Sequence, residues 1–259
     1  ANWFSSYLGG PDVSGDAPWR GYNLLATDFA LGLFTEEDER YEATFMTEVF
    51  TRYYAAYDGD NGTAPDGQKS HYYVPQWATQ ADIDAYILAN PTTQIHLWGT
   101  YAAGVVSSDY QTIPARKFDD PNSLYASDKR VSTRDIILSR LGETYLIAAE
   151  AYLKAGVPST GLDRLNEVRR RAGVANATLG QFNIDYILDE RGRELLGEYK
   201  RWFDLKRTGT LVARASAHNY KIKAANFVGI DGKLKILRPI PQSALDLNQN
   251  KDFPQNPGY

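Results

Sequence analysis

The spacing of the apolar residues changes at Thr133, and this change constrains the fold more than any other feature of the sequence. From there the hydrophobic residues recur with the period of about 3.6 that is typical of an amphipathic helix. This first stretch ends at Gly156, a residue type that commonly ends helices. Pro158 opens a second stretch, which ends at Gly173. The sequence therefore predicts two consecutive helices joined by a short turn.

Small residues where the two helices are expected to cross predict close antiparallel packing. The spacing matches one tetratricopeptide unit, with Gly161 at a position where that repeat usually has alanine. One unit cannot bury its own stacking faces, so either neighbouring repeats or the rest of the chain should cover them. The apolar stripe of the second helix is Leu162, Leu165 and Val168. The stripe of the first helix is Ile137, Leu138, Leu141, Tyr145, Ala148, Ala149 and Tyr152.

A third helix is expected over residues 184–208, and it is crowded with charge. Glu190 and Glu194 lie one helical turn apart, about 6 Å, which is close to the carboxylate separation of retaining glycosidases. In the alternative, which we favour, both carboxylates form ion pairs with arginines, because opposite charges one turn apart are common where helices pack. Trp202 is expected to lie in the core. The possible partners are Arg191, Arg193 and Arg201 on the same helix and Arg169, Arg170 and Arg171 on the preceding one.

Residues 1–132 show no sustained helical period. Apolar and polar residues alternate over 40–50, which predicts a half-buried strand. Residues 58–69 consist largely of Gly, Asp and Asn and predict surface turns. We further expect a short helix over 82–89, an extended segment over 95–106 and a loop over 109–129. After the charged helix we expect a loop with scattered short elements over 211–232, a short strand over 235–240 and a helical turn over 243–247.

Four segments, taken in order, resemble the C-terminal half of the SusD/RagB family. They are the helix pair ILSRLGETYLIAAEAYLKAG and STGLDRLNEVRRRAG, the charged ILDERGRELLGEYKRWFDLKRTG, Pro-Ile-Pro at 239–241 and the terminal QNPGY. The resemblance covers about half of the chain, from Thr133 to Tyr259. It implies a mainly α fold with long loops and few short strands. We expect one domain over 1–259, with an irregular, ligand-facing half (1–132), a tetratricopeptide-like part (133–210) and a terminal segment (211–259).

The resemblance also implies a function, because members of this family are outer-membrane lipoproteins of Bacteroidetes that capture nutrients, mostly glycans. By that resemblance the chain binds extracellular glycans without catalysis, at the cell surface, and delivers them to a SusC-like TonB-dependent transporter. Members begin with a signal peptide and a lipid-modified cysteine; Ala1 begins this chain, so we expect a C-terminal fragment whose lipid anchor lies elsewhere. The alternatives are a peptide-binding member of the family, a helical-repeat scaffold for other proteins, and a glycoside hydrolase.

Composition excludes several classes of function. The net charge of −4 argues against nucleic acid, which requires clustered Lys and Arg. No apolar run approaches the 18 or so residues that span a membrane. The absence of cysteine excludes disulfides and thiolate catalysis. No serine-hydrolase elbow and no nucleotide-binding loop is present. We therefore expect no catalytic residue and no cofactor.

Metal ligands are also not apparent in the sequence. The only histidines are His71, His96 and His218, and none has a second ligand at metal-binding spacing. Asp58, Asp60 and Asn61 are rich in oxygen, but no glutamate occupies the twelfth position that a calcium loop of the EF-hand type requires. We therefore predict no metal site.

Aromatic residues carry the functional signal, with 18 Tyr, 10 Phe and 5 Trp, many of them in polar, loop-forming surroundings. The C–H faces of sugar rings can stack on indole and phenol rings, and polar side chains can bond the sugar hydroxyls. Trp98, in an alternating apolar stretch, is expected to lie in the core. The strongest candidates follow the turn-rich insertion that a rigid scaffold would present. They are Trp77, Tyr72 and Tyr73 with Gln76 as a polar partner, and then Trp19.

Overall fold

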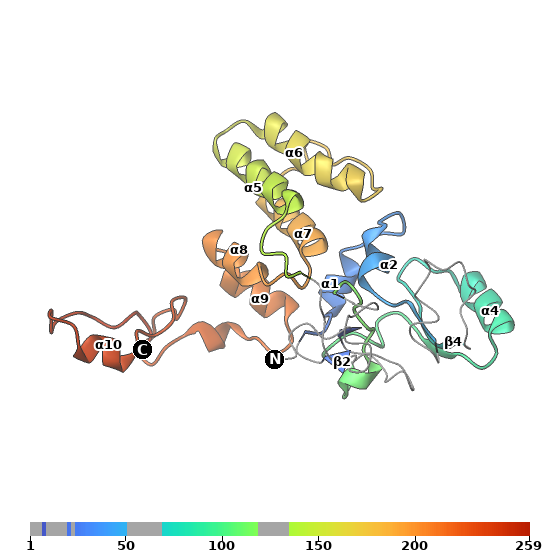
Figure 1. Ribbon diagram of the computed structural model, residues 1–259, viewed down its shortest axis with the longest axis horizontal. Helices are drawn as coiled ribbons and strands as arrows, with labels where there is room; N and C mark the ends of the chain where they lie inside the picture. The colour runs from blue at the N-terminus through green and yellow to red at the C-terminus, as the bar shows by residue number, and fades with distance from the viewer. Residues whose placement is uncertain (1–6, 9–19, 22–23, 51–68, 119–134) are drawn as a thin grey trace. The chain divides into compact units, whose positions relative to one another are not determined.

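The computed structural model describes residues 7–8, 20–21, 24–50, 69–118 and 135–259. The chain forms two compact units, Ala1–Tyr199 and Lys200–Tyr259. The described elements are mostly helices, with one three-stranded sheet and one pair of two-residue strands (Figure 1). The prediction of a mainly α fold with long loops and few short strands is therefore confirmed.

The first half of the first unit consists of short elements around a small mixed sheet. Strand β4 is central, antiparallel to β3 and parallel to β5, and helix α4 makes the connection between the two parallel strands. Strands β1 and β2 pair separately, in parallel. The elements are β1 (Tyr7–Leu8), β2 (Arg20–Gly21), α1 (Asp28–Gly32), α2 (Arg40–Thr44), β3 (Glu48–Phe50), β4 (Lys69–Tyr73), α4 (Gln80–Ala89), β5 (Gln94–His96) and the 3₁₀ helix η2 (Asp109–Gln111).

The segment predicted as a strand over 40–50 begins as helix α2, and only its end forms strand β3. Asp38 lies just before the N-cap residue Glu39 and bonds the first turn: its carboxylate accepts the backbone N–H of Arg40 at 3.1 Å, and its carbonyl accepts that of Tyr41 at 2.9 Å. The prediction was wrong because the apolar residues fit both periods. The buried positions follow the helical spacing, at Tyr41, Thr44 and Phe45.

Other local predictions have mixed outcomes. Helix α4 is confirmed, and it begins with a capping box between Thr79 and Asp82 and ends at Asn90. The predicted extended segment over 95–106 is wrong beyond β5, because the chain turns from Leu97 onward. Within the segment 235–240 no strand forms.

Aromatic rings build the core of this half. Phe34 makes edge contacts with Tyr41 and Phe45, at centroid distances of 5.7 and 5.8 Å. Tyr73 meets Tyr101 edge to face at 5.2 Å. Edge-to-face pairs of this kind add about 0.5–1.5 kcal/mol each beyond the area that they bury. Trp98 packs against this cluster, as predicted.

The second half of the first unit is helical, and it contains α5 (Leu141–Lys154), α6 (Pro158–Arg171) and α7 (Ile184–Glu194). Helices α5 and α6 lie side by side and antiparallel (Figure 1). Gly156 and Gly173 end these two helices with φ of 75° and 74°, as predicted. Their shared core, together with α7, is formed by Leu146, Ala149, Leu165, Val168 and Ile187.

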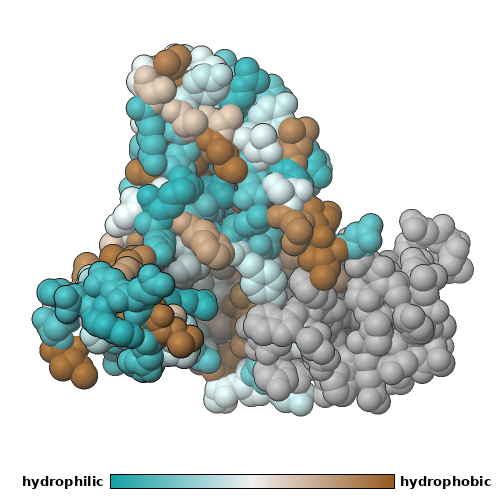
Figure 2. All heavy atoms as spheres, turned by 60° about the vertical axis from the view of Figure 1, so that its left-hand side comes forward, coloured by the Kyte–Doolittle hydropathy of each residue, from teal (hydrophilic) through white to brown (hydrophobic). Residues whose placement is uncertain are grey.

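Helix α5 begins later than predicted, so Ile137 and Leu138 precede it and are exposed. Leu141 and Tyr152, predicted on the buried face, are also exposed. Figure 2 shows hydrophobic patches of this kind among hydrophilic side chains. Among the described residues no helix has the length and apolar character needed to cross a membrane.

The predicted single helix over 184–208 is two helices. After α7 the chain passes through Gly197 and Tyr199, with φ of 77° and 60°. A Cβ on Gly197 would lie 2.5 Å from the ring of Phe118, so the break also allows close packing. The left-handed backbone at these residues ends α7, and a new helix starts at Arg201.

The second unit contains α8 (Arg201–Arg207), α9 (Leu211–His218), η3 (Ala224–Phe227) and α10 (Gln242–Asp246). Helix α10 confirms the predicted turn, and α9 lies in the segment that was predicted as loop with scattered short elements. Trp202 is 44% exposed and stacks on Phe227, so its prediction as core is wrong. The terminal segment folds back on the Pro-Ile-Pro segment: the side chain of Gln255 accepts the N–H of Ile240 at 2.7 Å and donates to its carbonyl at 2.9 Å.

Candidate ligand-binding region and its charged support

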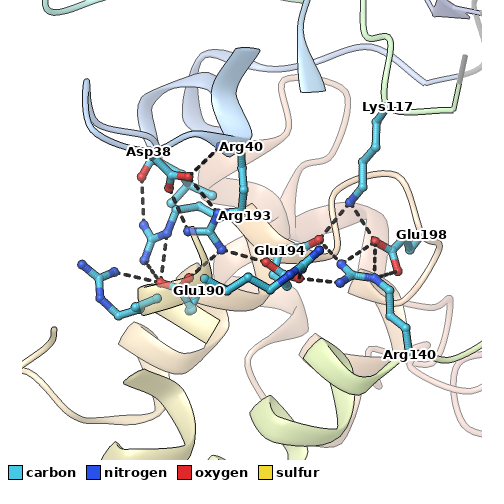
Figure 3. Close-up of polar contacts among 11 residues, drawn as sticks. Asp38, Arg40, Lys117, Arg140, Glu190, Arg193, Glu194 and Glu198 are labelled. Carbon is cyan, nitrogen blue, oxygen red and sulfur yellow. Dashed lines mark hydrogen bonds and ion pairs between the residues drawn. The ribbon is translucent and has the colours of Figure 1, made fainter. Parts of the chain in front are cut away.

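Glu190, Glu194 and Glu198 lie in a row, with basic side chains on either side (Figure 3). Arg40 links the first two glutamates through one nitrogen, Nη1, which donates to Glu190 at 2.8 Å and to Glu194 at 2.9 Å. The remaining nitrogens of Arg40 bind Asp38, both at 2.8 Å. One arginine thus ties the start of α2 to α7.

Glu190 is completely buried and accepts from three arginines. Besides Arg40 these are Arg169, at 2.9 Å, and Arg193, at 2.7 Å. Arg193 also donates to the carbonyl of Leu33 at 2.8 Å. Burial alone raises the pKa of Glu190, but the charges of Arg193 and Arg40 outweigh it, and the pKa lies below its usual range.

Glu194 and Glu198 are held from the other side. Arg140 donates to both carboxylates and to the Glu194 carbonyl. Lys117 bonds the same carbonyl at 2.8 Å and Glu198 at 2.7 Å. Burial raises the pKa values of both glutamates, but their bonds to Arg140 lower them overall. A carboxylate that stays ionised in this way cannot donate the proton that glycoside hydrolysis requires.

The ion-pair interpretation of Glu190 and Glu194 is therefore confirmed. The predicted partners Arg169, Arg171 and Arg193 are present. The sequence did not reveal the partners from distant segments, which are Arg40, Lys117 and Arg140. We call the group of Asp38, Arg40, Lys117, Arg140, Arg169, Arg171, Glu190, Arg193, Glu194 and Glu198 the charged network.

The charged network joins the aromatic half of the first unit to its helices. Asp38, Arg40 and Lys117 come from the half that carries the predicted ligand residues, and the other members come from the helical half. Glu190 and Glu194 are buried and each pairs with three arginines, so removing one of them leaves largely buried guanidinium groups short of a counter-charge. Its role is to hold the two halves in one arrangement, which gives a ligand surface a rigid support.

Trp77 and Gln76 follow strand β4 in a turn. Trp77 is half-buried and meets Tyr41 edge to face at 4.8 Å, so part of its indole stays at the surface. Gln76 is exposed, and its amide nitrogen donates to the carbonyl of Phe34 at 2.6 Å. The core thus holds both residues in place, with a partly exposed indole next to a polar side chain.

Tyr72 lies on the sheet face that α4 covers. Its ring stacks on Tyr86 at a centroid distance of 3.9 Å, and the Tyr86 hydroxyl donates to Glu48 at 2.8 Å. Lys69 pairs with the same carboxylate at 2.6 Å. Burial first, and then the negative charges of Glu48, Asp82 and Glu42, raise the pKa of Tyr72. Tyr86 thus supports one side of the Tyr72 ring. The sequence did not reveal Tyr86 and Glu48 as its neighbours.

Tyr73 does not fit its predicted role. Its side chain is completely buried and packs between Tyr101 and His96, so it offers no face to a ligand. The reason is the two-residue period of a strand, which points Tyr72 and Tyr73 to opposite faces of the sheet. The predicted Trp19 and the oxygen-rich residues Asp58, Asp60 and Asn61 lie outside the described residues.

His71 and His96, treated as isolated in the sequence, meet in the structure. The parallel pairing of β4 and β5 places them on one face, with His71 Nδ1 2.9 Å from His96 Nε2. Burial, and then the charge of His71, lower the pKa of His96 to about 4, and burial also lowers that of His71. Among the residues that the structure describes, no group of three or more His, Cys, Asp or Glu gathers at one point.

The histidine pair predicts a loss of stability in mild acid. The unfolded imidazoles bind protons near pH 6.5 and the folded His96 only near pH 4, so protons favour the unfolded state between these values. The contribution is complete above pH 6.5 and falls as the pH drops toward 4. The two pKa values alone give about 2 kcal/mol between pH 7.5 and pH 5, and solvent screening of the partly buried ring reduces this; we therefore expect the free energy of unfolding to decrease by about 1 kcal/mol, and by clearly less in His96→Gln. Urea titrations at the two pH values measure this change. An equal change in the free energy of unfolding in the unchanged chain and in His96→Gln would contradict the prediction.

The fold and the site together define a class of protein. It has a helical-repeat part and an irregular part rich in aromatic residues, and its paired carboxylates stabilise the fold. Comparison with known proteins gives the family. The model of the SusD family, SusD_RagB, matches residues 28–259. The chain belongs to the SusD family, as the sequence analysis predicted.

Individual relatives agree with this assignment. The chain is 34% identical over 125 residues to the starch-binding protein SusD of Bacteroides thetaiotaomicron, which covers 48% of this chain and 22% of that protein. It is 33% identical over 148 residues to SusD-like protein P2 of Formosa agariphila, which covers 52% of this chain and 28% of that protein. The chain thus spans about a quarter of the length of these relatives.

Two of the similar solved structures match nearly the whole chain. One of them is a surface glycan-binding protein A from Bacteroides thetaiotaomicron in complex with laminarihexaose, with a TM-score of 0.56 and 20% identity, covering 99% of this chain and 46% of that one. At this identity the likeness shows the fold alone. The names of these relatives describe binding proteins rather than enzymes, in agreement with the prediction of a non-catalytic chain.

Proposed function

We propose that this chain binds extracellular glycans and belongs to an outer-membrane nutrient-capture protein of the cell surface, which delivers them to a SusC-like TonB-dependent transporter. Family membership carries the proposal, because relatives of the chain are named for binding starch and glycans. The chemistry of the irregular half supports it. Aromatic rings with free faces and ionised or amide side chains next to them are the groups that bind sugars without breaking bonds.

We place the glycan contacts at Trp77 with Gln76 and at Tyr72. Tyr41 contacts Trp77, and the carbonyl of Phe34 holds Gln76. Tyr86 stacks on one side of the Tyr72 ring. A ring already supported on one side loses little conformational freedom when a sugar stacks on it, which lowers the cost of binding. Trp19, which lies outside the described residues, stays a candidate for the same surface.

The test is affinity electrophoresis and tryptophan fluorescence with starch, laminarin, other polysaccharides and a set of peptides. We expect saturable binding to at least one glycan, weakened about tenfold or more in Tyr72→Ala or Trp77→Ala. Trp202→Ala is the matched control, because Trp202 is an exposed tryptophan of the second unit, and its binding should equal that of the unchanged chain. Circular dichroism checks that each variant is folded.

Other outcomes would change the proposal. Binding only to peptides would favour a peptide-capturing member of the family, and binding to none of the ligands, by a folded chain, would favour a scaffold for other proteins. Release of reducing sugar that stops in Glu190→Gln would indicate a hydrolase, against the lowered pKa of that carboxyl. Co-purification with a SusC-like transporter tests the delivery step separately.

A further inference from the structure

The paired histidines of strands β4 and β5 have no part in the glycan surface proposed above, and they form the most specific chemical feature outside it. His71 Nδ1 and His96 Nε2 lie 2.9 Å apart. Imidazole is the most common nitrogen ligand of metals in proteins, so two adjacent imidazoles can bind one ion together. We propose that His71 and His96 form a chelating site for a divalent transition metal of the Ni²⁺ or Cu²⁺ type.

The separation of the nitrogens supports this choice of metal. Metal–imidazole bonds of about 2.0–2.1 Å that meet at about 90° place the two nitrogens about 2.9 Å apart. That angle belongs to adjacent ligands in square-planar or octahedral sites, which Cu²⁺ and Ni²⁺ prefer. A tetrahedral Zn²⁺ site needs a wider separation, about 3.3 Å. In the structure the two nitrogens share a hydrogen bond at 2.9 Å, so the ligand atoms already lie close to the separation that a 90° chelate requires. Among the divalent first-row ions, nitrogen ligands bind Ni²⁺ and Cu²⁺ more tightly than Mn²⁺, Fe²⁺ or Co²⁺.

The surroundings favour a fixed position for the pair. Tyr73 is completely buried and stacks on the His96 ring at 4.4 Å with an angle of 10°, so it forms a rigid floor. Gln94 lies directly opposite His71 in the strand register and two residues before His96, on the same face. On metal binding its amide oxygen would supply a third ligand, and water would complete the coordination.

Metal binding requires only a local change. The two rings, which are 24° from parallel, must turn until both lone pairs point at the ion, and both rings are only partly buried. In the metal-free pair one ring donates its N–H to the other ring. When the metal binds, that ring carries the proton on its second nitrogen, so no proton leaves the protein.

Calorimetric titration of the untagged chain with Ni²⁺ at pH 7.5 tests the site. We expect one ion per chain and an affinity that falls about tenfold or more in His71→Gln and in His96→Gln. His218→Gln is the matched control, since it removes the remaining histidine, which lies in the second unit, and should leave the affinity unchanged. No binding by the unchanged chain, or equal affinity in all four proteins, would overturn the proposal.

A second measurement covers variants that fail to fold. Crystals of the unchanged chain soaked in Ni²⁺ should show an anomalous difference peak between the His71 and His96 rings. A peak at any other residues, or none, would contradict the site. Since glycan binding is tested with other variants and without metal, either proposal can fail without the other.

Discussion

Replacing Glu190 by glutamine should lower the free energy of unfolding by about 3–5 kcal/mol. The carboxylate is completely buried and accepts from Arg40, Arg169 and Arg193, so its loss leaves three guanidinium groups without their shared anion. Removing one partner of a buried ion pair costs much more than the pair itself contributes, because the remaining charges stay desolvated. Urea denaturation followed by circular dichroism measures the change.

The matched control is Glu167→Gln on helix α6. Glu167 pairs with Arg170 at 2.6 Å, but their side chains are 43% and 49% exposed, so this change should cost less than about 1 kcal/mol. If the two variants lost the same small amount of stability, the charged network would not hold the two halves of the first unit together. Glycan binding should weaken in Glu190→Gln only at urea concentrations where the variant unfolds.

Gly161→Ala should destabilise the chain by about 1–3 kcal/mol, although alanine is the better helix former. In an exposed helix the same change would stabilise by about 1 kcal/mol. Here the new Cβ would lie 2.7 Å from the carbonyl oxygen of Ala149 and 2.8 Å from the ring of Phe182. The backbone of α5 cannot yield as a flexible side chain can, so α5 and α6 would have to separate.

Gly180→Ala provides the comparison, because a Cβ at Gly180 would meet no atom within 4 Å. We expect its free energy of unfolding to stay within about 0.5 kcal/mol of the unchanged chain. Thermal and urea denaturation of both variants give the two values. A stabilising Gly161→Ala would show that the helices cross with more space than the structure has.

The sequence predicted the elements whose determinants are local. Gly156, Pro158 and Gly173 fixed the ends of α5 and α6, and Asn90 ended α4, because helix ends depend on a few neighbouring residues. The two-residue period failed at α2, where the buried residues follow the helical spacing and Asp38 bonds the first turn.

Contacts between distant segments were not predictable in this way. Arg40 and Glu190 are 150 residues apart, and His71 and His96 are 25 apart, so no local pattern joins them. The burial of Tyr73 was within reach of the sequence, since adjacent residues of a strand point to opposite faces. Tyr72 and Tyr73 were therefore never able to serve one surface together.

In our proposal the irregular half of the first unit binds the ligand, and the helices support that half. Hydrogen exchange of the chain, with and without the glycan that binds best, tests this division of roles most directly. We predict slower exchange within residues 69–101, which contain Tyr72, Gln76 and Trp77, and unchanged exchange in α6. Protection confined to α5, α6 or the second unit would contradict the account and place the ligand on the helical repeat.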